Sequence, residues 1–265
     1  MFTIAVANQK GGCGKTTTAV NLAACLAEKK RSVALIDLDP QSQATTHFRL
    51  DEQGIKTTVF DVMLGRQLTL DQACVPVSEK LSIVPSKLLT HDGETELLMQ
   101  PRRLFRLKDS LGSIAETTDY AIIDCPPNLG LLTYNALLAS NAVLLTVETS
   151  FLALHGVSRL LEVVDELQRK HNHTLGLMAL ATMYDTRTRY AQEVLEDMRG
   201  YFRNQMLKTI IRRNVRLTEA ASIGLPVNEY RPSSYGAMDY VALANEIDRM
   251  VRPKIIKARD LKKFV

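Results

Sequence analysis

A segment rich in glycine and lysine near the start of the chain has the residue types that bind phosphate. NQKGGCGKTTT, residues 8–18, follows an apolar stretch of strand length, FTIAVA. A phosphate-binding loop reads G-x-x-x-x-G-K-[ST]: its backbone N–H groups surround phosphate, its lysine contacts the β- and γ-phosphates, and its hydroxyl binds Mg²⁺. Gly14, Lys15 and Thr16 match the end of this pattern, but Gln9 replaces the first glycine and Lys10 adds a second lysine.

The surroundings of this loop support a nucleotide site over the alternative of a glycine-rich turn with a chance lysine. A strand-like run, a glycine loop, a lysine, a hydroxyl and a helix-period segment occur in the order that phosphate binding requires. The predicted nucleotide-contacting residues form one run: Lys10, Gly11, Gly12, Cys13, Gly14, Lys15, Thr16 and Thr17.

Aspartates end two further strand-like runs. VALIDLD places Asp37 and Asp39 at its end, and YAIIDCPP places Asp124 after four strand residues, where a carboxylate that orients Mg²⁺ through water is expected. An aspartate at a strand end also serves ordinary turns, so each is ambiguous alone. Together with the loop they predict a Mg²⁺ site at Thr16, Asp39 and Asp124, with Asp37 supporting either the loop or the water shell of the metal.

The order of apolar runs predicts an α/β fold with a mostly parallel sheet covered by helices on both faces. Strands are expected at residues 2–7, 32–37, 81–85, 120–124, 142–147, 175–182 and 207–211. Helices are expected at residues 16–28, 101–114, 131–139, 154–171, 190–202 and 235–250. Ligands of such sheets bind beyond the carboxyl ends of the strands, where the glycine loop would lie. One domain is expected over residues 1–251, followed by a basic tail over 252–265.

Composition limits the alternatives. The chain has 265 residues, 46% of them hydrophobic and 23% charged, which is typical of a globular enzyme. No apolar run approaches the roughly 18 residues that span a bilayer, and no C-x-x-C pair among four cysteines suggests a zinc site or a disulfide framework. We therefore expect a cytoplasmic, reduced protein whose net charge of +4 permits a local basic patch.

Taken together, these motifs resemble the deviant Walker A ATPases, specifically the ParA/Soj partition ATPases. The resemblance rests on KGGCGKTT, LIDLDPQSQAT and IIDCPPNLGLLTYNAL, and it continues through MYDTRTRYAQEVLEDMRGYF and RNVRLTEAASIGLPVNEYRPSSYGAMDYVALANEI. It covers about residues 2–250, and the D-P-Q triplet at residues 39–41 favours ParA/Soj over the MinD branch. It implies a P-loop NTPase fold and slow, Mg²⁺-dependent hydrolysis of ATP.

The resemblance also assigns roles to individual residues. Lys10 matches the family's signature lysine, which reaches across an ATP-bound homodimer to the partner's nucleotide and neutralises charge on the transferred phosphoryl group. The implied catalytic residues are Lys10, Lys15 and Asp39, the last of which positions the attacking water. Arg213 and Asn214 match the region near the adenine, although Arg212 stands where the family often has proline.

A basic segment predicts contact with DNA. Residues 187–216 contain eight basic and three acidic residues, an excess of five positive charges. Such a surface binds phosphates without reading bases, unless it is only a solvated helix face. The resemblance points to Arg187 and Arg216 as the DNA-binding residues. It also implies association with the nucleoid and hydrolysis stimulated by a ParB-type partner.

Other functions fit parts of the sequence. A ParA-like ATPase can position a protein assembly instead of a chromosome or plasmid, and the sequence does not identify the cargo. The ending VRPKIIKARDLKKFV is basic and amphipathic, so a MinD-like ATPase on anionic lipid is an alternative. An iron–sulfur ATPase and a protein that binds ATP without hydrolysing it are two more, but the positions of the cysteines and of Asp39 and Asp124 argue against them.

Overall fold

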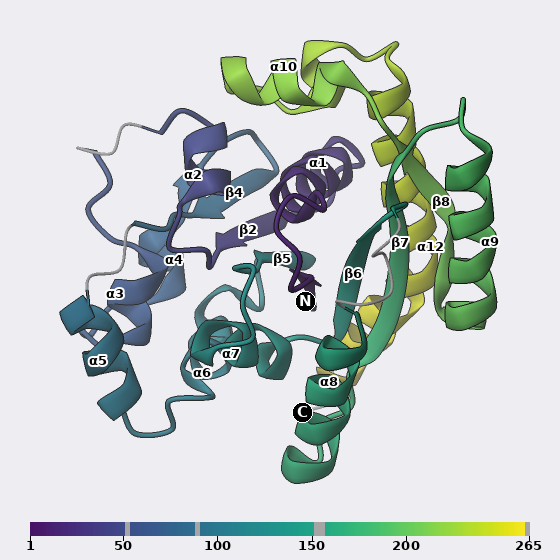
Figure 1. Cartoon of the computed structure of the whole chain (residues 1–265). Coiled ribbons are helices and arrows are strands. Elements are labelled where there is room, and N and C mark those ends of the chain that lie inside the picture. Colours follow the sequence, from purple (N-terminus) through teal and green to yellow (C-terminus); the bar gives the residue numbers. More distant parts are fainter. Residues whose placement is uncertain (51–53, 88–90, 151–156, 263–265) are drawn as a thin grey trace.

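A single eight-stranded sheet forms the centre of the molecule, with strand order β3-β4-β2-β5-β1-β6-β7-β8 (Figure 1). The computed structural model describes the chain except residues 51–53, 88–90, 151–156 and 263–265. All pairings are parallel except that of β3 with β4. The strands are β1 Phe2–Ala7, β2 Val33–Asp37, β3 Val75–Pro76, β4 Leu81–Val84, β5 Tyr120–Asp124, β6 Ala142–Glu148, β7 Gly176–Tyr184 and β8 Met206–Arg212. The predicted single α/β domain with a mostly parallel sheet is confirmed.

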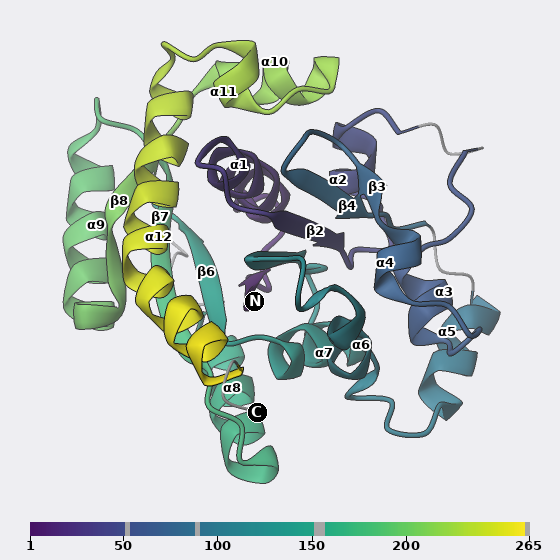
Figure 2. The same cartoon turned by 180° about the vertical axis from the view of Figure 1, so that it is seen from behind.

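Helices cover both faces of this sheet (Figure 2). In chain order, the helices before β5 are α1 Lys15–Glu28, α2 Gln43–His47, α3 Val59–Met63, α4 Leu70–Ala73, α5 His91–Met99 and α6 Arg106–Ser110, which continues as a 3-10 turn over Leu111–Ile114. The helices after β5 are α7 Leu131–Ala139, α8 Val157–His171, α9 Arg189–Phe202, followed by a 3-10 turn at Arg203–Gln205, α10 Val215–Ile223, α11 Val227–Tyr230 and α12 Tyr235–Lys262.

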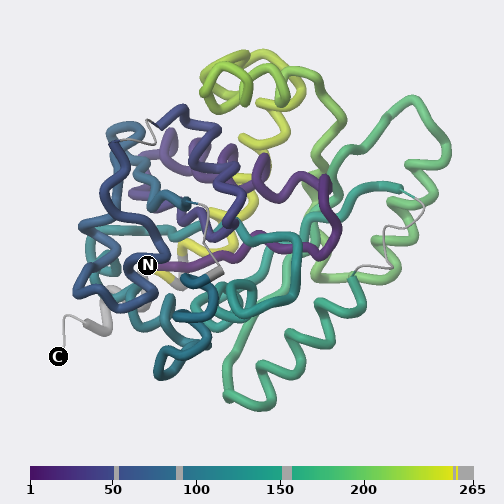
Figure 3. Tube along the Cα trace, turned by 60° about the vertical axis from the view of Figure 1, so that its left-hand side comes forward, coloured from purple at the N-terminus to yellow at the C-terminus, as the bar shows by residue number. Residues whose placement is uncertain are grey.

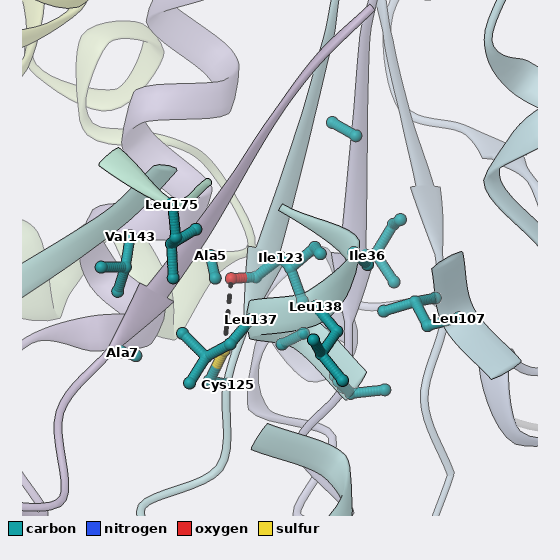
Figure 4. Close-up of a cluster of buried hydrophobic side chains, with 14 of the residues drawn as sticks. Ala5, Ala7, Ile36, Leu107, Ile123, Cys125, Leu137, Leu138, Val143 and Leu175 are labelled. Carbon is teal, nitrogen blue, oxygen red and sulfur yellow. Dashed lines mark hydrogen bonds between the residues drawn. The ribbon is translucent and has the colours of Figure 1, made fainter. Parts of the chain in front are cut away.

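Two hydrophobic cores lie on opposite faces of the sheet because the central strands are mostly apolar at both odd and even positions. In β1, Ile4 and Val6 pack in one core with α1 and α12, whereas Ala5 and Ala7 pack in the other with α7 and α8. Figure 4 shows part of the second core around Cys125, whose thiol approaches the carbonyl of Ile123 at 3.9 Å. Burial on both faces is what continuous apolar runs predict for parallel strands.

The observed helices differ from the predicted ones where the sequence signal is weak. Helix α6 begins at Arg106, later than expected, and α10 was not predicted because Ala220 is its only buried residue and leaves no apolar periodicity. Helix α12 continues to Lys262 through Pro253, so it runs across the expected boundary between the domain, residues 1–251, and the tail, residues 252–265. The predicted start of α8 at residue 154 lies outside the described residues. Among the helices that are described, none is long and apolar enough to cross a membrane.

Strand β8 forms one edge of the sheet, and α12 covers that edge with carboxylates. The backbone N–H groups of Lys208 and Thr209 donate to Glu246 at 2.7 and 2.9 Å. The N–H group of Arg212 donates to Asp239 at 2.9 Å. Side chains of α12 therefore take the acceptor places that a further strand would occupy.

A buried polar network joins α12 to the opposite end of the strands. Asp248 accepts two hydrogen bonds from Arg31, at 2.9 and 3.0 Å, and one from the Tyr120 hydroxyl at 2.9 Å. Burial, followed by this hydrogen bond to Asp248, raises the pKa of Tyr120. The Tyr120 hydroxyl and the Arg31 guanidinium therefore both depend on the Asp248 carboxylate for these hydrogen bonds.

We predict that Asp248→Ala lowers the free energy of unfolding by about 2–3 kcal/mol, because it leaves the Tyr120 hydroxyl and the Arg31 guanidinium without their partner. Urea denaturation measures the change. Asp109→Ala, which removes an exposed ion pair with Arg102, is the matched control and should have a much smaller effect. Equal losses from the two substitutions would contradict the structural role of Asp248.

Candidate functional site

The loop between β1 and α1 has the backbone of a phosphate-binding loop. Gly12 and Gly14 have φ of +74° and +85°, a conformation that strains residues with a side chain. Asn8 braces the loop: its side-chain amide donates to the Thr146 carbonyl at 2.6 Å and accepts from the Lys10 N–H at 3.0 Å. The N-terminus of the 14-residue helix α1 therefore opens onto the turn, an arrangement suited to binding an anion.

Strand β7 supports the same loop from the side. The Thr182 hydroxyl donates to the Cys13 carbonyl at 2.9 Å, and the Cys13 thiol donates to the Lys10 carbonyl at 3.1 Å. The Cys13 side chain is buried, so it packs beneath the loop. Thr182 was not predicted as a site residue, since a threonine inside a strand carries no signal in the sequence.

The two lysines of the loop occupy different environments. Lys15 is 7% exposed and its ammonium donates to the Lys10 carbonyl at 3.0 Å, inside the loop. The Lys10 side chain is 37% exposed and its ammonium contacts Glu148 at 2.5 Å and Ser150 at 3.1 Å. The sequence analysis did not identify these two partners. Glu148 is the last residue of β6, the strand beside β1, and Ser150 lies two residues beyond it.

Parallel pairing brings the three predicted aspartates to the loop. Asp124 is in register with Val6 of β1 on one side and with Asp37 of β2 on the other. Asp37 and Asp124 are fully buried, and Asp39 lies two residues beyond the end of β2. Residues that are far apart in the sequence therefore meet at the carboxyl ends of neighbouring strands.

Asp37 and Asp39 hold the chain that follows β2. Asp37 accepts hydrogen bonds from the N–H and the hydroxyl of Thr45, at 2.8 and 2.7 Å, and from the N–H of Asp39 at 3.2 Å. Asp39 accepts from the N–H of Gln41 at 2.9 Å. Burial raises the pKa of Asp37 to about 6, against these hydrogen bonds. These contacts join Asp37 to the segment after β2, and its two predicted roles, support of the glycine loop or of the water shell of the metal, stay predictions.

Asp124 has the properties of a carboxylate that needs a cation. Neither of its oxygens has a hydrogen-bond partner among the described residues. Burial first, and then the charge of Asp37, raise its pKa well above the ordinary value, while the nearby Thr16 hydroxyl and the Lys15 ammonium act in the opposite direction. A buried carboxylate without donors, next to a hydroxyl and another carboxylate, fits Mg²⁺ held by oxygen ligands and water.

A cavity of about 440 Å³ adjoins the loop on the side of α10. Its wall combines loop and helix residues, Gly14 and Thr17, with the two residues predicted to lie near the adenine, Arg213 and Asn214. The remaining lining residues are Thr182, Met183, Ile211, Arg212, Leu217, Thr218, Ala221 and Tyr240. The mostly apolar wall and its place beside the loop suit a nucleotide base.

A second cavity, of about 480 Å³, lies between the end of β7 and the start of α10. It is lined by Tyr184, Asp185, Thr186, Arg187, Arg212, Arg213, Val215 and Tyr235. Arg212 separates it from the first cavity: its guanidinium binds Asp239 and lies 4.2 Å from the centre of the Tyr235 ring. Arg187 lines this cavity, and Arg216 stands in the first turn of α10 beside Val215.

Comparison with known proteins identifies the family. A family model described as an AAA domain matches residues 1–177. The sporulation initiation inhibitor protein Soj of Bacillus subtilis (strain 168) is 42% identical over 245 residues, covering 92% of this chain and 97% of that protein. The chromosome partitioning protein ParA of Myxococcus xanthus (strain DK1622) is 40% identical over 257 residues, covering 97% and 91%. The chain belongs to the Soj/ParA family of partition ATPases.

A solved structure agrees with this membership. The crystal structure of a protein named cobyrinic acid a,c-diamide synthase, from Mycobacterium smegmatis, holds ADP and magnesium. It is 32% identical to this chain, has a TM-score of 0.83, and the match covers 95% of this chain and 96% of that one. The P-loop ATPase fold and activity expected from the sequence are therefore confirmed for this Soj/ParA protein.

We predict that Asp124→Asn separates stability from activity. Removing a buried charge without hydrogen-bond donors should leave the free energy of unfolding unchanged or raise it by about 1 kcal/mol. Loss of the carboxylate predicted to orient Mg²⁺ should lower ATP hydrolysis at least about 100-fold. Urea denaturation in EDTA and phosphate release with Mg²⁺ measure the two effects. A variant that hydrolyses ATP at the wild-type rate would contradict the assignment.

Proposed function

We propose that this Soj/ParA ATPase is a positioning switch that dimerises on ATP, binds DNA without sequence preference, and is released when a ParB-type partner stimulates hydrolysis. ATP and Mg²⁺ are its cofactors. The proposal builds on the partition ATPase activity of the family. A role in partition is preferred because the identities to Soj and ParA, 42% and 40%, exceed the 32% identity to the Mycobacterium protein.

The observation that carries the proposal is the placement of Lys10. A loop lysine that serves only its own nucleotide has its ammonium inside the loop, as Lys15 does at 3.0 Å from the Lys10 carbonyl. The Lys10 side chain instead extends to Glu148 and Ser150 at the end of β6 and is more than one third exposed. A second subunit that docks against the carboxyl ends of the strands brings the phosphates of its nucleotide within reach of the Lys10 ammonium, so ATP joins the two subunits.

The remaining site residues fit the chemistry of phosphoryl transfer. Gly11, Gly12 and Gly14 let backbone N–H groups face the phosphates, and Thr16, Asp39 and Asp124 surround the place for Mg²⁺. When bound, the metal supplies positive charge to the β- and γ-phosphates. Asp39 orients the attacking water from its position two residues beyond the end of β2, where its carboxylate also accepts the N–H of Gln41.

The cavity beside Gly14 and Thr17 suits the adenine. Asn214 accepts the N–H of Arg216 at 2.9 Å and so begins helix α10, which brings a nucleotide-lining residue next to a DNA-facing one. A nucleotide in this cavity therefore lies against the helix that carries Arg216, since Leu217, Thr218 and Ala221 of α10 line the cavity. This proximity supports a DNA surface whose use depends on the nucleotide.

We predict that the protein binds a sequence-scrambled DNA duplex with ATP and that Arg216→Glu weakens this binding at least about tenfold. Phosphate contacts account for such binding, so it should also weaken between 50 and 200 mM salt. Fluorescence anisotropy with ATP, ADP or no nucleotide measures it. A protein that ignores DNA in every nucleotide state would contradict the proposed DNA switch.

We predict that Lys10→Ala binds ATP with nearly the wild-type affinity but stays a monomer, because its own nucleotide keeps Lys15 while the cation between subunits is lost. Light scattering coupled to gel filtration, with ATP and with ADP, measures the mass. Lys170→Ala, which removes an exposed lysine of α8, is the control and should still dimerise. An ATP-dependent dimer of Lys10→Ala would rule out the role of Lys10 between subunits.

A further inference from the structure

The basic surface between β7 and α10 is less positive in three dimensions than along the sequence. Four of the eight basic residues counted over residues 187–216 form ion pairs with carboxylates: Arg187 with Asp185, Arg199 with Glu196, Arg212 with Asp239 and Arg216 with Glu219. Three of these four carboxylates lie outside residues 187–216. The excess of five positive charges therefore overstates what DNA meets at this surface.

The two arginines proposed to face DNA are both among those paired. The Arg187 guanidinium donates to both oxygens of Asp185, at 2.9 and 2.7 Å, and holds the pKa of that carboxyl well below its ordinary value. Arg216 donates to both oxygens of Glu219, at 2.8 and 2.6 Å. Arg187 donates from two nitrogens, Nε and Nη2, the paired geometry with which a guanidinium also binds a phosphate group, whereas both contacts of Arg216 come from its Nη1.

These pairs are fixed in place but remain open to solvent. Side-chain exposure is 82% for Arg187 and 42% for Arg216, so a phosphate group can approach either guanidinium. Asp185 also accepts the N–H of Arg187 at 3.1 Å, and Glu219 also accepts the Tyr230 hydroxyl at 3.0 Å. Since exposed ion pairs are weak, phosphate can replace the carboxylate, but the carboxylate stays nearby and repels the phosphate.

We propose that Asp185 and Glu219 are built-in competitors of DNA phosphate, which keep the DNA affinity of a single subunit low. This inference rests on the proposed function, because it concerns the same DNA surface. Each subunit must exchange two carboxylates for phosphates, which weakens its binding. In an ATP dimer the second subunit binds at high effective concentration, so the pair still holds DNA. The competition therefore makes DNA binding depend on dimerisation and hence on the nucleotide.

The nearby backbone links this surface to the nucleotide cavity. The Arg213 N–H donates to the Tyr184 carbonyl at 2.9 Å, which joins the end of β8 to the residue before Asp185. Asn214 begins the helix that carries both Arg216 and Glu219. Asp185 and Arg187 therefore follow the end of β7 by one and three residues, and Arg216 and Glu219 follow Asn214 by two and five residues.

The test is the double variant Asp185→Asn/Glu219→Gln, which removes two charges but keeps the oxygen acceptors of the turn and of the Tyr230 hydroxyl. We expect its affinity for a scrambled duplex without nucleotide to rise about tenfold, because neither arginine has to leave a charged partner. The slope of log affinity against log salt should steepen by about one to two units, since more counterions are released. A purely structural role of the two carboxylates would not steepen this slope.

The control is Asp109→Asn/Glu166→Gln, which makes the same chemical changes in the exposed ion pairs with Arg102 and Lys170. Asp109 lies on α6 and the pair of Glu166 with Lys170 lies on α8, towards the other end of the molecule from α10 (Figure 1, Figure 2 and Figure 3). The control has the same net charge as the test variant, so general attraction to DNA predicts equal affinities for the two. Thermal unfolding and binding of a fluorescent ATP analogue show whether each variant is folded.

The outcomes separate this inference from the proposed function. If wild type binds DNA with ATP and the test variant binds no more tightly than the control without nucleotide, the inference is wrong and the function stands. If the test variant binds DNA and wild type does not in any nucleotide state, the competition is real and the proposed switch is wrong. If folded samples of both ignore DNA, both are wrong. If wild type binds DNA only with ATP, and the test variant, unlike the control, also binds it tightly without nucleotide, both are supported.

Discussion

The parallel pairing of β5 between β1 and β2 is the constraint on which the site depends. It sets Asp124 beside Val6 and Asp37, and so places the acidic residues at the edge where the glycine loop begins. The strands themselves are apolar along their length because both faces are covered, which leaves their ends as the place for charge. This placement leaves Asp124 buried, and neither of its oxygens has a hydrogen-bond partner among the described residues.

Ion pairs shape the rest of the functional surface. Lys10, Arg187 and Arg216 are the cations expected to meet partners outside the subunit, and each contacts a carboxylate of its own subunit. Such pairs cost little to break at an exposed surface, so they fix the direction of a side chain without preventing its later use. Charge on this protein is therefore better described by pairs than by a sum along the sequence.

The sequence predicted the elements with strong local signals and missed those that depend on distant contacts. Seven of the eight strands were found because most are largely apolar runs, whereas the two-residue β3 was missed, and the loop was found because Gly14, Lys15 and Thr16 follow β1 within a few residues. Helix α10 was missed because it is held by its cap and by the chain around it, with one buried residue. Thr182 and Glu148 were missed because their partners lie far away along the chain. The charge excess was overestimated for the same reason: Asp185, Glu219 and Asp239 reach the arginines from outside the segment.

The carboxylates on the β8 edge have a consequence for crowding. A protein that gathers in many copies on one scaffold brings its exposed sheet edges close together, and unpaired strand edges then promote growth into fibres. In this chain Glu246 and Asp239 occupy the free N–H groups of Lys208, Thr209 and Arg212. These three N–H groups are therefore not available to a neighbouring copy for strand addition, which lowers the tendency of concentrated molecules to join into a continuous sheet at this edge.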